Sequence, residues 1–137
     1  MKKVFVDTNI LVDLIADRPP FSKFAIELFE KAENNEAKLY TSSHSIATTH
    51  YLLKKHLPEK DLREIITSLL NLIELIPVDG NIVKKSLQSK HRDFEDAIQM
   101  FAAETINDMN FIVTRNLRDF KDANITVLPA DELLKHL

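Results

Sequence analysis

Several acidic residues occupy positions in this sequence from which their side chains could bind one metal ion together. Asp7 ends the first short apolar segment of the chain, and Asp119 follows a later one at residues 111–114. Asp93 and Asp96 are three residues apart in a stretch with helical spacing, which makes them neighbours on one helix face. Carboxylates that converge on one crevice repel each other unless a hard divalent cation compensates their charge. Such a site activates water and stabilises the charge that develops during phosphodiester cleavage.

Helix capping and turn formation are the competing explanations for these residues. Asp7 could accept backbone N–H bonds at a helix start, and for Asp93 a cap is the better explanation when that residue is taken alone. Asp96 lies one turn further into its helix, beside the apolar stripe, so a cap explains it less well. Asn116 and Asp119 could form an ordinary turn, which their residue types favour. The metal interpretation therefore depends on all five side chains meeting at corresponding strand ends.

Short strands that alternate with helices would position these residues. The pattern predicts strands at residues 2–6, 38–41, 74–78, 111–114 and 125–128, and helices at 9–16, 22–34, 42–55, 58–73, 81–89, 93–107 and 131–137. Pro77 makes the third strand an edge or terminal one. Strands separated by helices pair in parallel, so we expect one α/β domain over residues 1–137 with helices on both faces of a sheet. Ligands of such sheets gather at the carboxyl ends of the strands, near a topological switch point.

Composition narrows the class of protein. Of the 137 residues, 45% are apolar and 28% charged, the balance of a soluble globular domain. The chain has one glycine and no cysteine, which excludes glycine-rich phosphate loops, zinc–thiolate sites and thiol catalysis. No apolar run approaches the ~18 residues of a membrane helix, and no signal-peptide cleavage site follows the N-terminal segment, so we expect a cytoplasmic location. A net charge of −3 requires any bound RNA to use a local basic strip.

Three segments resemble the signature segments of PIN domains, in particular the VapC-like bacterial subgroup. They are VFVDTNILVDL at Val4–Leu14, DFEDAIQMFAAE at Asp93–Glu104 and IVTRNLRDF at Ile112–Phe120. The resemblance extends in element order over essentially the whole chain. It implies a three-layer fold with a parallel five-stranded sheet flanked by helices, an acidic pocket that binds Mg²⁺ or Mn²⁺, and endonucleolytic cleavage of RNA.

The resemblance also implies roles for the acidic residues. Asp7 and Asp96 match the aspartates that would bind the principal metal ion. Asp93 and Asp119 would complete the acidic pocket through direct or water-mediated contacts. Asn116 matches the polar position of the last motif, where it would orient a carboxylate, a metal-bound water or the scissile phosphate.

Other polar residues beside the acids are candidates for shaping the site and contacting RNA. Thr8 and Asn9 match positioning residues and would shape the first loop through side-chain-to-backbone hydrogen bonds. Arg115 and Arg118 could bind phosphates bidentately, and residues 90–92 could extend that basic strip. For each basic residue, a solvated surface position is the alternative.

The resemblance implies partners as well as a substrate. A VapC-like enzyme is normally held in check by a small antitoxin protein, which inserts a segment near the active site. PIN domains commonly form homodimers, and the apolar helices expected at residues 22–34 and 58–73 could provide that surface. Ordinary core packing is the better explanation for most apolar residues of these two helices.

The helix after the second strand departs from the family pattern, in which it carries a glutamate. Thr48, or with less support Thr49, stands at that position, and no acid occurs between Tyr40 and Pro58. The site should then bind its metal more weakly or use Asp93 as a substitute, and a PIN subgroup with the same loss carries an extra acid there. A second function therefore stays open, that of a PIN-like domain that has lost turnover and binds RNA or a protein.

Other active-site types fit the sequence less well. Haloacid-dehalogenase-like phosphotransferases need a second aspartate two residues after the first, where this chain has Asn9, and receiver domains need a doublet of acids that VFVDTN lacks. His44, His50 and His56 are spaced by six residues, so they do not share a helix face and a zinc site is not expected.

Overall fold

The computed structural model describes residues 1–137 and contains one five-stranded parallel sheet. The elements follow in the order β1 Lys2–Val6, α1 Thr8–Ala16, α2 Phe21–Glu33, β2 Ala37–Ser42, α3 Ser43–Leu53, α4 Glu59–Leu69, β3 Ile73–Ile76, α5 Gly80–Gln88, α6 Phe94–Glu104, β4 Phe111–Val113, the 3₁₀ helix η1 Leu117–Phe120, β5 Thr126–Leu128 and α7 Ala130–Leu134. The strand order is β3-β2-β1-β4-β5, and every neighbouring pair is parallel. The predicted α/β fold is confirmed.

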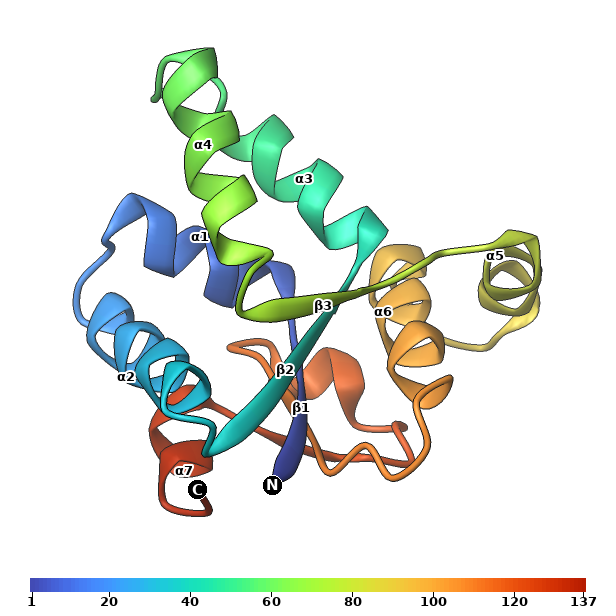
Figure 1. Ribbon diagram of the computed structural model, residues 1–137. Helices are drawn as coiled ribbons and strands as arrows, with labels where there is room; N and C mark the ends of the chain where they lie inside the picture. The colour runs from blue at the N-terminus through green and yellow to red at the C-terminus, as the bar shows by residue number, and fades with distance from the viewer.

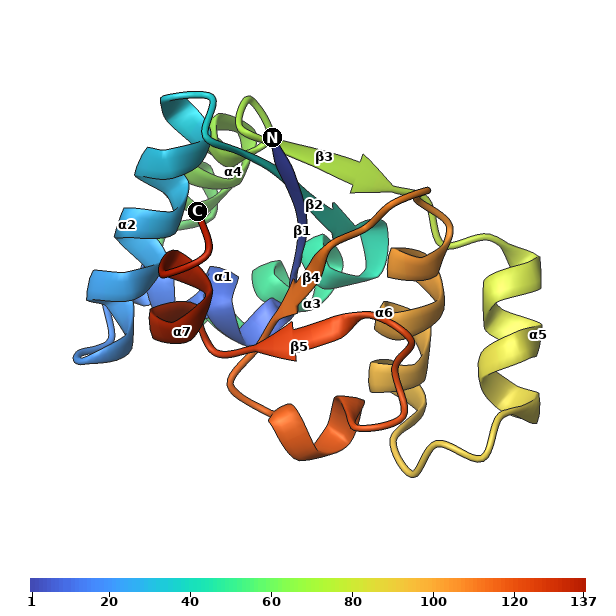
Figure 2. The ribbon, with the colours of Figure 1, turned by 90° about the horizontal axis from the view of Figure 1, so that it is seen from below.

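Helices cover both faces of the sheet because the central strands are apolar on both sides. In β1, Val4 and Val6 point into a core cluster shared with α1, α2 and α7, whereas Phe5 points into a second cluster shared with α6. Figure 2 shows these layers, with α2 and α7 on one side of the sheet and α6 on the other. Helix α5 lies outside α6 and packs mainly on it.

Helices α3 and α4 form a hairpin that projects from the end of the sheet where β2 finishes (Figure 1). A small apolar cluster joins this hairpin to α1 through Val12, Leu53, Leu62 and Ile66. No helix of the structure is long and apolar enough to cross a membrane.

Most element boundaries differ from the predicted ones by one to four residues, and one element was not predicted. The helix predicted at residues 58–73 ends at Leu69, because Ile73 begins β3 by pairing with Leu39 of β2. The helix predicted at 93–107 ends at Glu104. The 3₁₀ helix η1 was not predicted, and it turns Phe120 into the core cluster beneath α6.

The strand order brings the predicted polar residues to one edge of the sheet. The chain leaves β1 toward β2 on one side, whereas β4 lies on the other side of β1, so the topological switch point lies between β1 and β4. In parallel sheets the crevice at this point, beyond the carboxyl ends of the strands, is the usual ligand site. Asp7 follows β1 there, and Thr114 follows β4.

Candidate active site

Asp7 is almost completely buried at this edge, with 4% of its surface exposed. Its Oδ1 accepts the backbone N–H of Thr8 at 2.8 Å, which caps α1, and its Oδ2 accepts the hydroxyl of Thr114 at 2.7 Å. Burial raises the pKa of Asp7, although the hydrogen bonds from Thr114, Thr8 and Gln99 oppose that rise. Capping and metal binding are compatible here, because the cap fixes a carboxylate that keeps an unused lone pair on Oδ2.

Hydrogen bonds tie the loop after β1 to the loop after β4. The hydroxyl oxygen of Thr114 accepts the side-chain amide of Asn9 at 3.3 Å and the backbone N–H of Asn116 at 3.0 Å. Asn9 in turn accepts the backbone N–H of Arg115 at 3.3 Å. These contacts hold Asn116 beside the Asp7 carboxylate.

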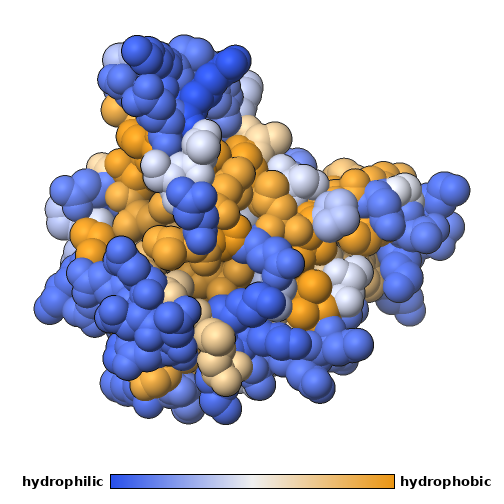
Figure 3. Space-filling view, viewed as in Figure 1, coloured by the Kyte–Doolittle hydropathy of each residue, from blue (hydrophilic) through white to orange (hydrophobic).

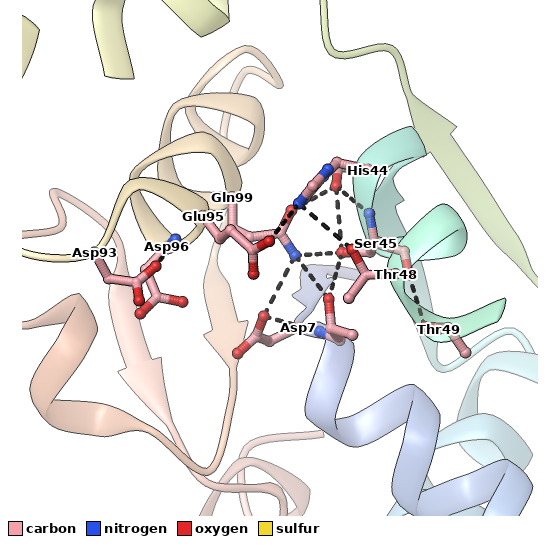
Figure 4. A network of polar contacts seen from close by, with 11 residues as sticks. Asp7, His44, Ser45, Thr48, Thr49, Asp93, Glu95, Asp96 and Gln99 are labelled. Atoms are coloured by element: carbon pink, nitrogen blue, oxygen red, sulfur yellow. Dashed lines mark hydrogen bonds and ion pairs between the residues drawn. The ribbon is translucent and has the colours of Figure 1, made fainter. Parts of the chain in front are cut away.

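A polar cavity of about 210 Å³ opens above Asp7, and we call it the acidic pocket. Five predicted residues line it together, namely Asp7, Thr8, Asn9, Asp96 and Asn116. Its remaining lining residues are Val12, Arg18, His44, Thr48, Leu52, Glu95 and Gln99. Figure 4 shows Asp7 below this cavity, with the acids of α6 on one side and α3 on the other.

Asp96 faces a surplus of negative charge. Burial raises its pKa to about 7, and the charges of Asp93, Asp7 and Asp119 together with a hydrogen bond to Asp119 add to that rise. Burial and neighbouring carboxylates both disfavour the ionised form of a carboxyl group. A divalent cation would supply a counter-charge.

Asp93 and Asp119 line a neighbouring cavity of about 180 Å³ rather than the acidic pocket itself. The other lining residues are Lys90, His91, Arg92, Arg118, Lys121 and Asp122, so we call this cavity the basic hollow. Asp93 accepts the backbone N–H of Asp96 at 3.0 Å and caps α6, as its capping interpretation predicted. Both acids therefore act on the acidic pocket through their charge, from its border with the basic hollow.

The oxygen donors fit an open Mg²⁺ or Mn²⁺ site. No group of three Asp, Glu or His side chains is close enough to hold a metal ion by itself. Magnesium sites commonly use one or two carboxylates, and water and substrate phosphate complete the coordination. Asp7 and Asp96 meet that requirement, and the negative charges of the three carboxylates that act on Asp96 favour a cation there.

Helix α3 presents no acid to the pocket. Thr48 lines the pocket, whereas Thr49 is buried and donates its hydroxyl to the carbonyl of Ser45 at 2.7 Å, so Thr48 occupies the position that faces the acids. His44 lies one turn earlier, with its Nε2 3.4 Å from the Thr48 hydroxyl and 3.6 Å from a Glu95 carboxylate oxygen.

Sequence reasoning missed four polar residues of the acidic pocket, namely Arg18, His44, Glu95 and Gln99. His44 was set aside because the three histidines of its region do not share a helix face, yet one histidine suffices to reach the pocket. Gln99 carried a readable signal, since it is the one amide in the otherwise apolar run from Ala97 to Ala103.

Arg115 has a partner inside the protein. Its guanidinium binds Asp13 through two hydrogen bonds, 2.7 Å from Nε and 3.0 Å from Nη2, and stacks 4.2 Å from the centre of the Phe21 ring. Asp13 is fully buried and also pairs with Arg18 at 3.0 Å, because a buried carboxylate needs counter-charges. Arg118 lines the basic hollow and is therefore the better placed of the two arginines for a phosphate.

The amino-acid sequence is similar to a known protein family and to a known ribonuclease. Residues 3–118 match a family described as PIN domain. The chain is 29% identical over 136 residues to Ribonuclease VapC1 of Aquifex aeolicus, covering 96% of this chain and 92% of that protein.

Two solved structures share the fold. The Mycobacterium tuberculosis protein VapC20, described as a Sarcin-Ricin loop cleaving toxin, aligns with a TM-score of 0.67 at 17% identity over 90% of this chain and 96% of that one. A toxin–antitoxin complex from Klebsiella pneumoniae aligns with a TM-score of 0.65 at 24% identity over 93% of this chain and 97% of that one.

Proposed function

Because the chain belongs to the PIN domain family, we propose that it is a divalent-metal-dependent endoribonuclease that hydrolyses RNA phosphodiester bonds. The ribonuclease VapC1, which aligns over nearly the whole chain, supports the reaction class. The observation that carries the proposal is the acidic pocket at the β1–β4 switch point, where Asp7 and Asp96 lie together and the charges of Asp7, Asp93 and Asp119 raise the pKa of Asp96. We further propose that residues 1–137 act as one nuclease domain, of a PIN subgroup with Thr48 in place of the usual acid.

Asp7 and Asp96 would hold the Mg²⁺ or Mn²⁺ ion. The bound ion would supply an activated water and stabilise the charge that develops on the scissile phosphate. Thr114 and Thr8 keep the Asp7 carboxylate fixed through their hydrogen bonds. Asn116 stands at the pocket wall, where its amide would orient the phosphate or the attacking water.

The RNA backbone would cross from the acidic pocket into the basic hollow. Arg118, Arg92 and Lys121 line this hollow beside Asp119, whose charge also acts on Asp96, so a phosphate next to the scissile one would meet these cations. Guanidinium groups bind phosphate through paired hydrogen bonds. The hollow thus provides the local basic strip that a chain with a net charge of −3 requires.

Protein partners form a separate part of the proposal. The similar Klebsiella pneumoniae structure is a toxin–antitoxin complex, and we propose that an antitoxin protein restrains this chain too. We also propose a homodimer through the face of α4 and β3, where Ile65, Leu70 and Leu75 are 36–40% exposed. Figure 3 shows apolar residues in orange across the middle of this face.

A PIN-like domain that binds RNA or a protein without turnover is the second candidate function. The specific observation that favours it is the lack of any acid on the pocket side of α3, where Thr48 stands. Retention of the four acids Asp7, Asp93, Asp96 and Asp119 favours the nuclease.

Cleavage of fluorescent RNAs by metal-stripped protein, with and without Mg²⁺ or Mn²⁺, separates the two functions. The nuclease proposal expects metal-dependent cleavage that Asp7→Asn and Asp96→Asn each abolish while circular dichroism stays unchanged. Metal-dependent RNA binding without cleavage by the unmodified protein would favour the binding module. Cleavage that survives both substitutions would contradict the assigned site.

A further inference from the structure

The side-chain amide of Gln99 is buried between the acids of the proposed metal site and α3, the helix that presents no acid to the pocket. Gln99 lies on α6, three residues after Asp96, and only 2% of its surface is exposed. Its Nε2 donates to Oδ1 of Asp7 at 3.3 Å and lies 3.4 Å from the Thr8 hydroxyl. Figure 4 shows the side chain reaching from α6 toward α3, with its amide above Asp7.

The other side of the same amide is anchored on α3. Gln99 Oε1 accepts the hydroxyl of Ser42 at 2.5 Å, and Nε2 also contacts the hydroxyl of Ser45. Ser42 caps α3 by accepting the backbone N–H of Ser45 at 2.9 Å. One side chain therefore joins the end of β1, the start of α3 and the helix that carries Asp96.

Only an amide offers both an acceptor for the Ser42 hydroxyl and a donor for the Asp7 carboxylate at this position. An apolar side chain would remove one acceptor of the Ser42 hydroxyl and one donor to Asp7, and lost partners of buried polar groups are costly. A carboxylate would place one more negative charge beside Asp7 and Asp96, which already repel each other. In the observed arrangement no buried side-chain nitrogen or oxygen lacks a hydrogen-bond partner.

The hydrogen bonds to Asp7 also determine which of its two carboxylate oxygens keeps a free lone pair. Oδ1 accepts two hydrogen bonds, from Thr8 and Gln99, which use both of its lone pairs. Oδ2 accepts one, from Thr114, and keeps one lone pair. Gln99 thus leaves Oδ2 as the oxygen of Asp7 that can bind a cation.

We propose that Gln99 is a positioning residue of the metal site: it fixes Asp7 relative to Asp96 so that two acids hold the cation although α3 offers Thr48. The proposal rests on the proposed metal-dependent function and deepens it. Hydrogen-bond partners of metal ligands typically change metal affinity by about 10- to 100-fold when removed.

The test measures Mn²⁺ binding to the metal-stripped full chain by electron paramagnetic resonance, without RNA. Gln99→Met keeps the length of the side chain but removes both polar atoms, and we expect a loss of about 10- to 100-fold in Mn²⁺ affinity. Gln99→Asn keeps the amide but shortens its reach, and we expect an intermediate loss. The Asn variant also decides the matter if the Met variant does not fold.

Thr49→Val is the matched control, because it removes a buried hydrogen bond close to the site. That bond joins the Thr49 hydroxyl to a backbone carbonyl of α3 and does not involve Asp7. We expect a comparable loss of thermal stability and unchanged Mn²⁺ affinity. In RNA cleavage, we expect excess Mn²⁺ to restore the Gln99→Met rate, which would not occur if the variant were simply misfolded.

Each outcome has a separate meaning. If the unmodified chain binds Mn²⁺ and Gln99→Met binds it equally well, the positioning role is wrong and the nuclease proposal stands. If Thr49→Val loses as much affinity as Gln99→Met, the effect is general destabilisation and the positioning role is again wrong. If the unmodified chain binds no Mn²⁺, the proposed function fails, and the role of Gln99 fails with it.

Discussion

The carboxylate of Asp93 accepts the backbone N–H of Asp96 at 3.0 Å, so the residue that caps α6 also holds its negative charge beside the acid one turn further on. After burial, this charge is the largest contribution that raises the pKa of Asp96 to about 7. Asp93, the cap, and Asp96, the proposed metal ligand, are thereby coupled through a single turn of helix, although only Asp96 lines the acidic pocket.

Metal affinity should depend on pH through Asp96. The ion binds the ionised carboxylate, and Asp96 keeps its proton up to about pH 7. We expect Mn²⁺ affinity to rise by up to about tenfold per pH unit below 7 and to level off above it. Calorimetric titration from pH 5.5 to 8.5 measures this, and Asp93→Asn should move the plateau to lower pH. An affinity that is constant across that range would contradict the assignment of Asp96.

Restoring an acid on α3 should strengthen the metal site. Thr48 lines the acidic pocket, so the carboxylate of Thr48→Glu would extend toward Asp7 and Asp96. We expect Mn²⁺ affinity to increase by about tenfold, because the affinity of such sites rises with ligand charge. Thr48→Gln is the control of equal length without charge. Equal affinities of the Glu and Gln variants would mean that position 48 does not reach the ion.

The basic hollow should account for part of the salt dependence of RNA binding. For a single strand, each neutralised phosphate contributes about 0.7 to the slope of log affinity against log salt. We expect Arg118→Gln and Arg92→Gln each to lower the slope by about that amount, measured by fluorescence anisotropy in the Asp7→Asn background. Lys60→Gln, at an exposed position of α4, should leave it unchanged. A slope unaffected by the two arginine changes would place the RNA elsewhere.

Arg115 should behave as a structural residue. Its substitution to Gln would leave the buried Asp13 with Arg18 as its remaining cation, and the lost charge-assisted bonds should lower the free energy of unfolding by about 1–3 kcal/mol. Urea denaturation measures this change. The salt slope of RNA binding should not change, in contrast to Arg118→Gln. A reduced slope with unchanged stability would restore the phosphate-contact role predicted for Arg115.

The sequence was sufficient to predict the sheet and five of the residues that line the acidic pocket, because both depend on local patterns. Apolar segments that end abruptly at Asp7 and Thr114 predicted strands whose ends meet, and their parallel pairing then brings distant side chains together. The helix of Asp96 was predicted from its apolar stripe. These features require only periodicity and the rules of strand connection.

Other contacts could not be predicted from those rules, because they depend on side-chain direction. Asp13 and Arg115 are 102 residues apart, and nothing in either local sequence indicates that they pair. Gln99 could be recognised as an exception within an apolar helix face, but its partners on α3 and β1 depend on how the helices pack. Asp93 shows the same limit, since its spacing from Asp96 favours a cap but does not exclude a ligand.

Helix α5 packs mainly on α6 and lies outside the three layers, which has a consequence for local stability. Residues 89–93 lead from this peripheral helix into the basic hollow, whereas Asp7 is tied to the central strands. Amide hydrogens of α5 should therefore exchange with solvent well before those of β1. The segment that leads into the basic hollow, proposed to bind RNA, should then open most readily. The end of β1 with Asp7, proposed to take part in the chemistry, should open last.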